Sequence, residues 1–299
     1  RVVEFVFLCP GPQLTLELGF DDAASVWPAL WFIVQCARRK GEWSRRPVFL
    51  IARGAAMTPD QADFLRSHGV SRAATIKLDG APDMKKAPPF RAQRARAVLM
   101  PGAVRPREWA QWFETWGFES VRLEPSALDA KGAPRFGAFH AEFLDWLVEH
   151  GENANLRDEW ATAFLAGRTW NLPGVDILEQ LAYDARGRVF TSEESAAAGG
   201  PVLGVAGELR YQDLAKIEAA SAVIAASHAD NQPQCSQCAY RSFCTVAPSL
   251  NHKLQGHYWG RTPDSAACVW QMGILDLFFG RLDDAKFLLL LNKWDIDMT

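Results

Sequence analysis

The chain has 299 residues, of which 48% are hydrophobic and 22% are charged, and its formal net charge at pH 7 is −3. This is enough apolar material for one large domain or two smaller ones. The negative charge and the absence of a long basic run argue against nucleic acid as a partner.

Neither of the apolar stretches near the two ends of the sequence predicts a membrane segment. The stretch 1–13, "RVVEFVFLCPGPQ", has too short an apolar run for a span and no small-residue cleavage site. The stretch 274–294, "ILDLFFGRLDDAKFLLLLNKW", is interrupted by charged residues and is interpreted as packed amphipathic helix. Six cysteines, four of them in the last third, are not a secreted disulfide scaffold. We therefore expect a cytoplasmic protein with no membrane contact.

Up to residue 150, short apolar runs alternate with helical patterns. The runs of strand length lie at 14–18, 47–52, 73–78, 96–100 and 120–123. The helical patterns lie at 25–40, 59–68, 106–117 and 137–150. Short strands that are apolar on both faces and alternate with helices predict a parallel sheet, either open or barrel-like. The predicted fold class is α/β, with a partial (β/α) barrel over residues 1–176.

The pattern changes after about residue 175. Residues 176–194, "DILEQLAYDARGRVFTSEE", predict two strands around a tight turn at Asp184–Gly187. A helix is expected over 211–227 and a single closing helix over about 268–291. Residues 177–299 are therefore predicted to form a second, small α+β domain.

Three cysteines lie close together in 234–244, "QCSQCAYRSFC": Cys235, Cys238 and Cys244. The spacing C-x2-C-x5-C lets several sulfurs point at one centre, and thiolates suit zinc and iron–sulfur clusters. Either centre needs four ligands for a closed site. Cys268 is the one cysteine further along the sequence, and we expect it to be the fourth ligand.

The other chemistry-bearing residues do not predict a second site. Cys9 and Cys36 each stand alone in an apolar segment and are expected to be small core residues. The histidines lack a metal-ligand spacing, and the sequence has no Gly-rich phosphate loop and no Gly-x-Ser-x-Gly motif. No catalytic residue is predicted.

The cysteine spacing resembles the SPASM extension of radical S-adenosylmethionine enzymes. That extension normally holds two auxiliary [4Fe–4S] clusters, and the four cysteines above match the ligands of the second. The ligands of the first have no counterpart: the G-x4-C motif would place a cysteine at Ser192, and neither 171–177 nor 245–248 contains one. The resemblance therefore implies one [4Fe–4S] cluster.

The first half of the chain resembles the barrel of the same family, and most closely that of peptide-modifying maturases such as those of His-Xaa-Ser peptide systems. The similar stretches include 13–42, 73–84 and 116–125. Two family features are missing. The C-x3-C-x2-C motif occurs nowhere in the sequence, and the Gly-Gly-Glu-Pro turn is replaced by Phe20–Ala23, "FDDA". Because phenylalanine in place of glycine is expected to obstruct the ligand, binding of S-adenosylmethionine is not expected.

Together these features favour a degenerate radical-SAM-like barrel (1–176) followed by a SPASM-like domain with one iron–sulfur site (177–299). We expect a non-catalytic subunit of a hetero-oligomer that works with a catalytic partner protein, a ribosomal peptide substrate, or both. Two alternatives stay open. One is an active maturase whose C-x3-C-x2-C motif precedes residue 1, and the other is a scaffold whose four cysteines bind zinc.

Overall fold

The computed structural model divides into two compact units. We call residues 11–166 and 276–299 the sheet unit, and residues 1–10 and 167–275 the cysteine unit. The predicted domain boundary at 176/177 lies outside the described residues and stays a prediction. The structure describes residues 1–9, 12–88, 90, 92–126, 132–151, 154–165, 181–197, 199–232, 234–244, 246 and 248–296.

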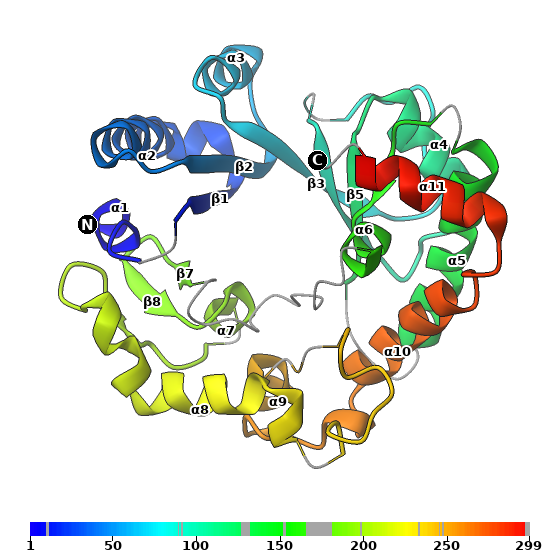
Figure 1. The fold of residues 1–299 in the computed structure, drawn as a ribbon. Coiled ribbons are helices and arrows are strands. Elements are labelled where there is room, and N and C mark those ends of the chain that lie inside the picture. The colour runs from blue at the N-terminus through cyan, green and yellow to red at the C-terminus, as the bar shows by residue number, and fades with distance from the viewer. Residues whose placement is uncertain are drawn as a thin grey trace. The chain divides into compact units, whose positions relative to one another are not determined.

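The sheet unit is built on six parallel strands that pair in chain order (Figure 1). The strands are β1 (Leu14–Asp22), β2 (Val48–Ala56), β3 (Ser71–Leu78), β4 (Arg94–Leu99), β5 (Ser120–Pro125) and β6 (Arg157–Asp158). The helices are α2 (Ala23–Ser44), α3 (Pro59–Ser67), α4 (Pro106–Thr115), α5 (Gly132–His150), α6 (Glu159–Leu165) and α11 (Ala285–Ile296). This confirms the predicted α/β class and the parallel sheet of a partial barrel.

Local sequence explains where the elements of the sheet unit begin and which face they bury. Thr58 and Gln61 form a capping box at the start of α3, each side chain accepting a hydrogen bond from the other residue's backbone N–H. Along the strands, most residues at alternate positions are apolar and lie beneath the helices, as Leu50, Ala74 and Leu123 do. The side chains between them point to the opposite face of the sheet.

The cysteine unit contains a small antiparallel sheet in the order β7-β8-β9. The hairpin predicted at Asp184–Gly187 is confirmed, and the Asp184 carboxylate accepts hydrogen bonds from the backbone N–H groups of Arg186 and Arg188. The core of this unit includes Phe5. Its elements are α1 (Val2–Val6), β7 (Ala182–Tyr183), β8 (Arg188–Phe190), α7 (Glu193–Ala197), β9 (Gly204–Val205), α8 (Glu218–Ser227) and α9 (Pro248–Gln255), with short 3₁₀ turns at Tyr211–Lys216, Ala229–Asn231 and Thr262–Asp264.

The single closing helix expected over 268–291 is wrong. The structure has two helices there, α10 (Ala266–Phe279) and α11, separated by a turn. Gly280 follows the end of α10, and Asp284 caps α11 by accepting a hydrogen bond from the backbone N–H of Lys286 (2.9 Å). Glycine is a poor helix former and aspartate favours the N-cap, so the break has a local cause.

The helix expected over 211–227 also begins differently, because its first six residues form a 3₁₀ turn. Ile217 has an extended backbone (φ −77°, ψ 124°), and α8 starts only after it. In the described part of the chain, no helix is both long enough and apolar enough to cross a bilayer.

Candidate functional site

The four cysteines predicted as ligands all lie in the cysteine unit, and each thiol is half-buried outside any disulfide. Three are in the loop between α8 and α9, and Cys268 is in the first turn of α10. The loop is a series of tight turns. The backbone N–H of Cys238 donates to the carbonyl oxygen of Cys235 (3.0 Å), and that of Cys244 donates to Tyr240 (3.0 Å).

Buried side chains hold this loop and the start of α10 in place. Gln232 is 3% exposed and donates from Nε2 to the carbonyl oxygen of Ala226 (3.0 Å), which ties the loop to α8. The hydroxyl of Ser265 accepts a hydrogen bond from the backbone N–H of Cys268 (3.2 Å) and so caps the first turn of α10. Cys268 is therefore held by its backbone, independently of its thiol.

Burial and neighbouring thiols shift the pKa values of Cys235 and Cys268. Burial raises the pKa of the Cys235 thiol, and the neighbouring Cys238 raises it further. Burial likewise raises the pKa of the Cys268 thiol to about 11, with further increases from Cys235, Cys238 and Asp264. The fold thus brings Cys268 into electrostatic reach of two thiols some thirty positions earlier. A metal would bind these sulfurs as thiolates, so its binding would displace their protons.

Cys244 is engaged differently from the other three. Its Sγ donates a hydrogen bond to Oε1 of Gln271, which is 2% exposed and lies one turn after Cys268 in α10. No three His, Cys, Asp or Glu side chains of the described residues are already arranged as metal ligands. The donor set of four thiols nevertheless fits zinc or an iron–sulfur cluster in its chemistry. Ligation by all four requires Cys244 to exchange its amide partner for the metal.

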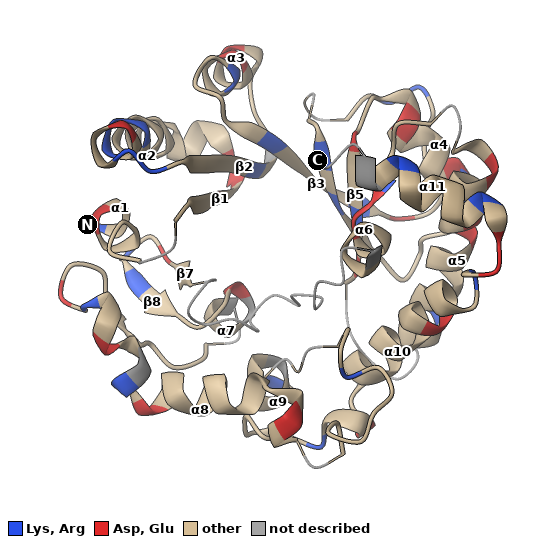
Figure 2. Cartoon of the chain, in the orientation of Figure 1, with Lys and Arg blue, Asp and Glu red and all other residues tan. Residues whose placement is uncertain are grey.

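A cluster of charged side chains lies on the sheet face opposite to the buried apolar side chains. The sequence analysis did not predict this cluster. The strand register places Arg53, Arg96 and Arg122 on this face, which we call the polar face. Figure 2 shows Lys and Arg along several strands of the sheet. The cationic residues of the polar face are Arg53, Lys77, Arg94, Arg96, Arg122 and Arg157.

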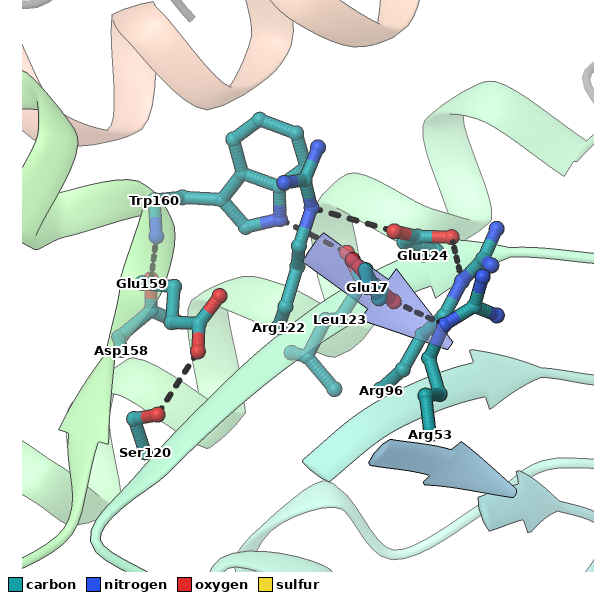
Figure 3. A network of polar contacts seen from close by, with 10 residues as sticks. All are labelled: Glu17, Arg53, Arg96, Ser120, Arg122, Leu123, Glu124, Asp158, Glu159 and Trp160. Atoms are coloured by element: carbon teal, nitrogen blue, oxygen red, sulfur yellow. Dashed lines mark hydrogen bonds and ion pairs between the residues drawn. The ribbon is translucent and has the colours of Figure 1, made fainter. Parts of the chain in front are cut away.

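Carboxylates and one aromatic ring hold the arginines of the polar face (Figure 3). Arg53 forms an ion pair with Glu17. Glu124 forms ion pairs with two arginines. Its carboxylate lies 2.7 Å from Nε of Arg96 and 3.1 Å from Nε of Arg122. The guanidinium of Arg122 also lies over the ring of Trp160, 4.5 Å from its centre. This contact with the ring fixes the plane of the Arg122 guanidinium group.

The phenylalanine of the stretch Phe20–Ala23 does not lie on the polar face. Phe20 points to the helix-covered side, where its ring lies directly over Gly54 of the neighbouring strand. Asp22 caps α2 by accepting a hydrogen bond from the backbone N–H of Ala24 (3.1 Å). Side chains alternate between the two faces along β1, and this alternation puts Asp21 on the polar face. Phe20 therefore does not lie on the polar face, and its expected effect on ligand binding stays a prediction.

The contact between Phe20 and Gly54 gives a stability prediction. A Cβ on residue 54 would lie 2.1 Å from the Phe20 ring, so Gly54→Ala should destabilise the sheet unit by about 1–3 kcal/mol. Urea unfolding measures the loss, and Phe20→Ala in the same chain should relieve part of it. Gly137→Ala on α5 is the control, because its added Cβ meets no atom within 4 Å. Equal effects of the two glycine substitutions would contradict the proposed collision.

Comparison with known proteins identifies the fold and nothing narrower. No family model matches the chain, and no curated protein matches it. Solved structures do match: a partial parallel barrel with a small antiparallel sheet is shared with proteins solved with bound AdoMet (S-adenosylmethionine).

These structures are of anSMEcpe. Hexahistidine-tagged anSMEcpe with bound AdoMet matches with a TM-score of 0.67 and 12% identity, over 97% of this chain and 88% of that one. Native anSMEcpe with bound AdoMet and Kp18Cys peptide matches with a TM-score of 0.66 and 10% identity, over 98% and 89%. At this level of identity the similarity shows the fold alone.

Proposed function

We propose that this chain is an iron–sulfur protein that serves as a non-catalytic subunit of a peptide-modifying complex. The observation that carries the proposal is the C-x2-C-x5-C spacing of Cys235, Cys238 and Cys244, together with the position of Cys268 in the same compact unit. The shared fold with anSMEcpe, which has been solved with AdoMet and with peptides, supports the peptide-modifying context.

The non-catalytic assignment rests on the ligand count. Four thiolates from Cys235, Cys238, Cys244 and Cys268 would occupy every iron of one [4Fe–4S] cluster, and such a cluster supplies electron transfer or fold stabilisation. A cluster whose four irons are all held by thiolates has no open iron for AdoMet. A catalytic partner would then supply the radical chemistry, and this chain would contribute cluster, surface and peptide contacts in a hetero-oligomer.

Metal analysis of the anaerobically purified chain tests the proposal. We expect about four irons per chain and broad visible absorption from a [4Fe–4S] cluster. One zinc per chain without iron would contradict the proposal and favour a zinc-stabilised scaffold, since zinc accepts the same four thiolates.

A second candidate function is an active radical enzyme, and the AdoMet bound in the anSMEcpe structures favours it. The two candidates differ in what the isolated chain does. We expect the reconstituted chain alone neither to bind AdoMet in a calorimetric titration nor to release 5′-deoxyadenosine when dithionite is added. Turnover by the isolated chain would overturn the non-catalytic assignment and establish the second candidate.

A further inference from the structure

The outward face of α2 carries large apolar side chains in contact with solvent. Phe32 is 61% exposed and Trp43 is 85% exposed. Together with Cys36 and Arg39 they follow one another at intervals of four, three and four residues, so all four lie along one face of the helix. We call these four residues the α2 ridge. Apolar side chains that gather on one exposed face are typical of a protein contact surface.

The fold keeps the α2 ridge turned outward. On the opposite side of the helix, Val34 and Ala37 are fully buried. A Cβ at Gly41 would lie 2.7 Å from the side chain of Val48, so α2 and β2 are already in close contact. Arg38 also ties the helix to β2, because its Nη1 donates to the carbonyl oxygen of Val48 (2.9 Å). Covering the ridge therefore takes a surface that does not belong to the sheet itself.

Opposite charges lie side by side at this surface. Arg39 belongs to the α2 ridge, and Glu42 follows three residues later on the exposed side of the helix. Within the described part of the chain, neither side chain forms an ion pair. When one patch meets its own copy across a two-fold axis, each contact between two different residues occurs twice. Arg39 of one copy can therefore pair with Glu42 of the other, and the reverse pair forms at the same time.

An antiparallel arrangement of two α2 helices would form both ion pairs, with the two-fold axis passing between Arg39 and Glu42. Because a helix rises about 1.5 Å per residue, Trp43 would lie about 4 Å from this axis along the helix, and the indole rings of the two copies would pack together. Tryptophan and arginine are among the side chains that most often anchor protein interfaces. Phe32 lies nearer the start of α2 and would extend the contact away from the axis.

We propose that the α2 ridge is the contact surface of a homodimer, held by Trp43, Phe32 and the reciprocal Arg39–Glu42 pairs. A helix of 22 residues is about 33 Å long, and a contact along one such helix is at the small end of protein interfaces. The dimer should therefore dissociate in the micromolar range. A bilayer is a poorer match, because the chain's formal charge of −3 opposes adsorption to anionic lipids. The homodimer does not depend on the proposed cluster.

Sedimentation velocity on the full chain tests for the homodimer. Between about 1 and 100 μM, the measured mass should rise from that of one chain toward that of two. A mass that stays at one chain throughout this range would overturn the proposal. The same protein is also mixed with vesicles of phosphatidylcholine and phosphatidylserine. Binding to these vesicles by a chain that stays monomeric would assign the ridge to a membrane surface and would likewise refute the homodimer.

Truncation of an aromatic side chain assigns the contact to the ridge. Trp43→Ala should weaken dimerisation about tenfold or more, because the substitution removes the indole ring from both copies. The side chain is exposed, so the monomer should fold as before. Leu289→Ala on α11 is the control, since that side chain is 63% exposed in the same unit and lies outside the α2 ridge. Equal dissociation constants for the two variants would show that the α2 ridge is not the contact.

Charge reversal gives the sharpest result, because mixing two defective variants should restore the dimer. Arg39→Glu and Glu42→Arg should each weaken the homodimer about tenfold, since each makes like charges meet twice. In an equimolar mixture of the two, both contacts of a mixed dimer again join opposite charges, so dimerisation should return, whereas general damage to the fold would not be repaired by mixing. Arg66→Glu on α3 reverses a 65% exposed arginine away from the ridge and should leave the dimer unchanged. Variants that remain monomeric when mixed would contradict the reciprocal pairs.

Discussion

Replacing Cys268 by alanine should remove essentially all of the iron from anaerobically purified protein, from about four irons per chain to a small residue. The variant leaves the three loop thiols without the ligand that comes from α10. Because Ser265 caps the backbone of Cys268, α10 should still start at the same place, and the loss is one of ligation. Inductively coupled plasma analysis and visible absorption measure it directly.

The same substitution should loosen the cysteine unit. Metal ligation in a small domain is coupled to its folding, so loss of the cluster should strongly destabilise this unit. Limited proteolysis should then cut within 167–275 faster than in the parent protein. Cys36→Ala, in α2 of the sheet unit, is the matched control and should change neither iron content nor cleavage. Full iron in Cys268→Ala would show that another residue is the fourth ligand.

Asp158→Ala should be among the most destabilising single substitutions in the sheet unit, at about 3–5 kcal/mol. Asp158 is fully buried and makes contacts with both carboxylate oxygens. Oδ2 lies 2.6 Å from Nε2 of buried His140, and Oδ1 accepts hydrogen bonds from the backbone N–H groups of Trp160 (2.8 Å) and Ala161 (2.9 Å). Alanine would remove the N-cap of α6. It would also leave the buried His140 side chain without its carboxylate partner, in apolar surroundings beside Phe278.

Urea unfolding measures this loss, and two further variants locate its cause. Asp158→Asn keeps an oxygen that can cap α6 and should cost less than alanine. A double-mutant cycle with His140→Phe should return a coupling of about 1–3 kcal/mol, as expected for groups in direct contact. Asp63→Ala is the exposed control, because the Asp63–Arg66 pair is 65% exposed at both ends and should contribute about 1 kcal/mol or less. A loss at Asp158 no larger than at Asp63 would contradict the buried-pair account.

Much of the fold could be predicted from the sequence because its signals are local. Short apolar runs separated by helical patterns placed the first five strands of the sheet unit, and "YDARG" placed the hairpin of the cysteine unit. The break between α10 and α11 also has a local cause, in Gly280 and in the cap at Asp284.

The candidate metal site could likewise be predicted only in part from local sequence. The C-x2-C-x5-C spacing is a local pattern, so it named Cys235, Cys238 and Cys244 without a structure. For Cys268 the sequence offers only its place as the next cysteine along the chain, and the fold brings its thiol into electrostatic reach of the C-x2-C pair. That these residues hold a cluster stays a prediction.

The sequence by itself determined the strands, the helix caps, the hairpin and the cysteine spacing, because each depends on residues a few positions apart. Tertiary structure alone decided the polar face and the His140–Asp158 pair. Arg53, Arg96 and Arg122 are scattered over some seventy positions without a shared motif, and they meet because the parallel register puts their side chains on one face. A shift of one residue in any strand would turn its side chains to the other face, and register is set by contacts between distant segments.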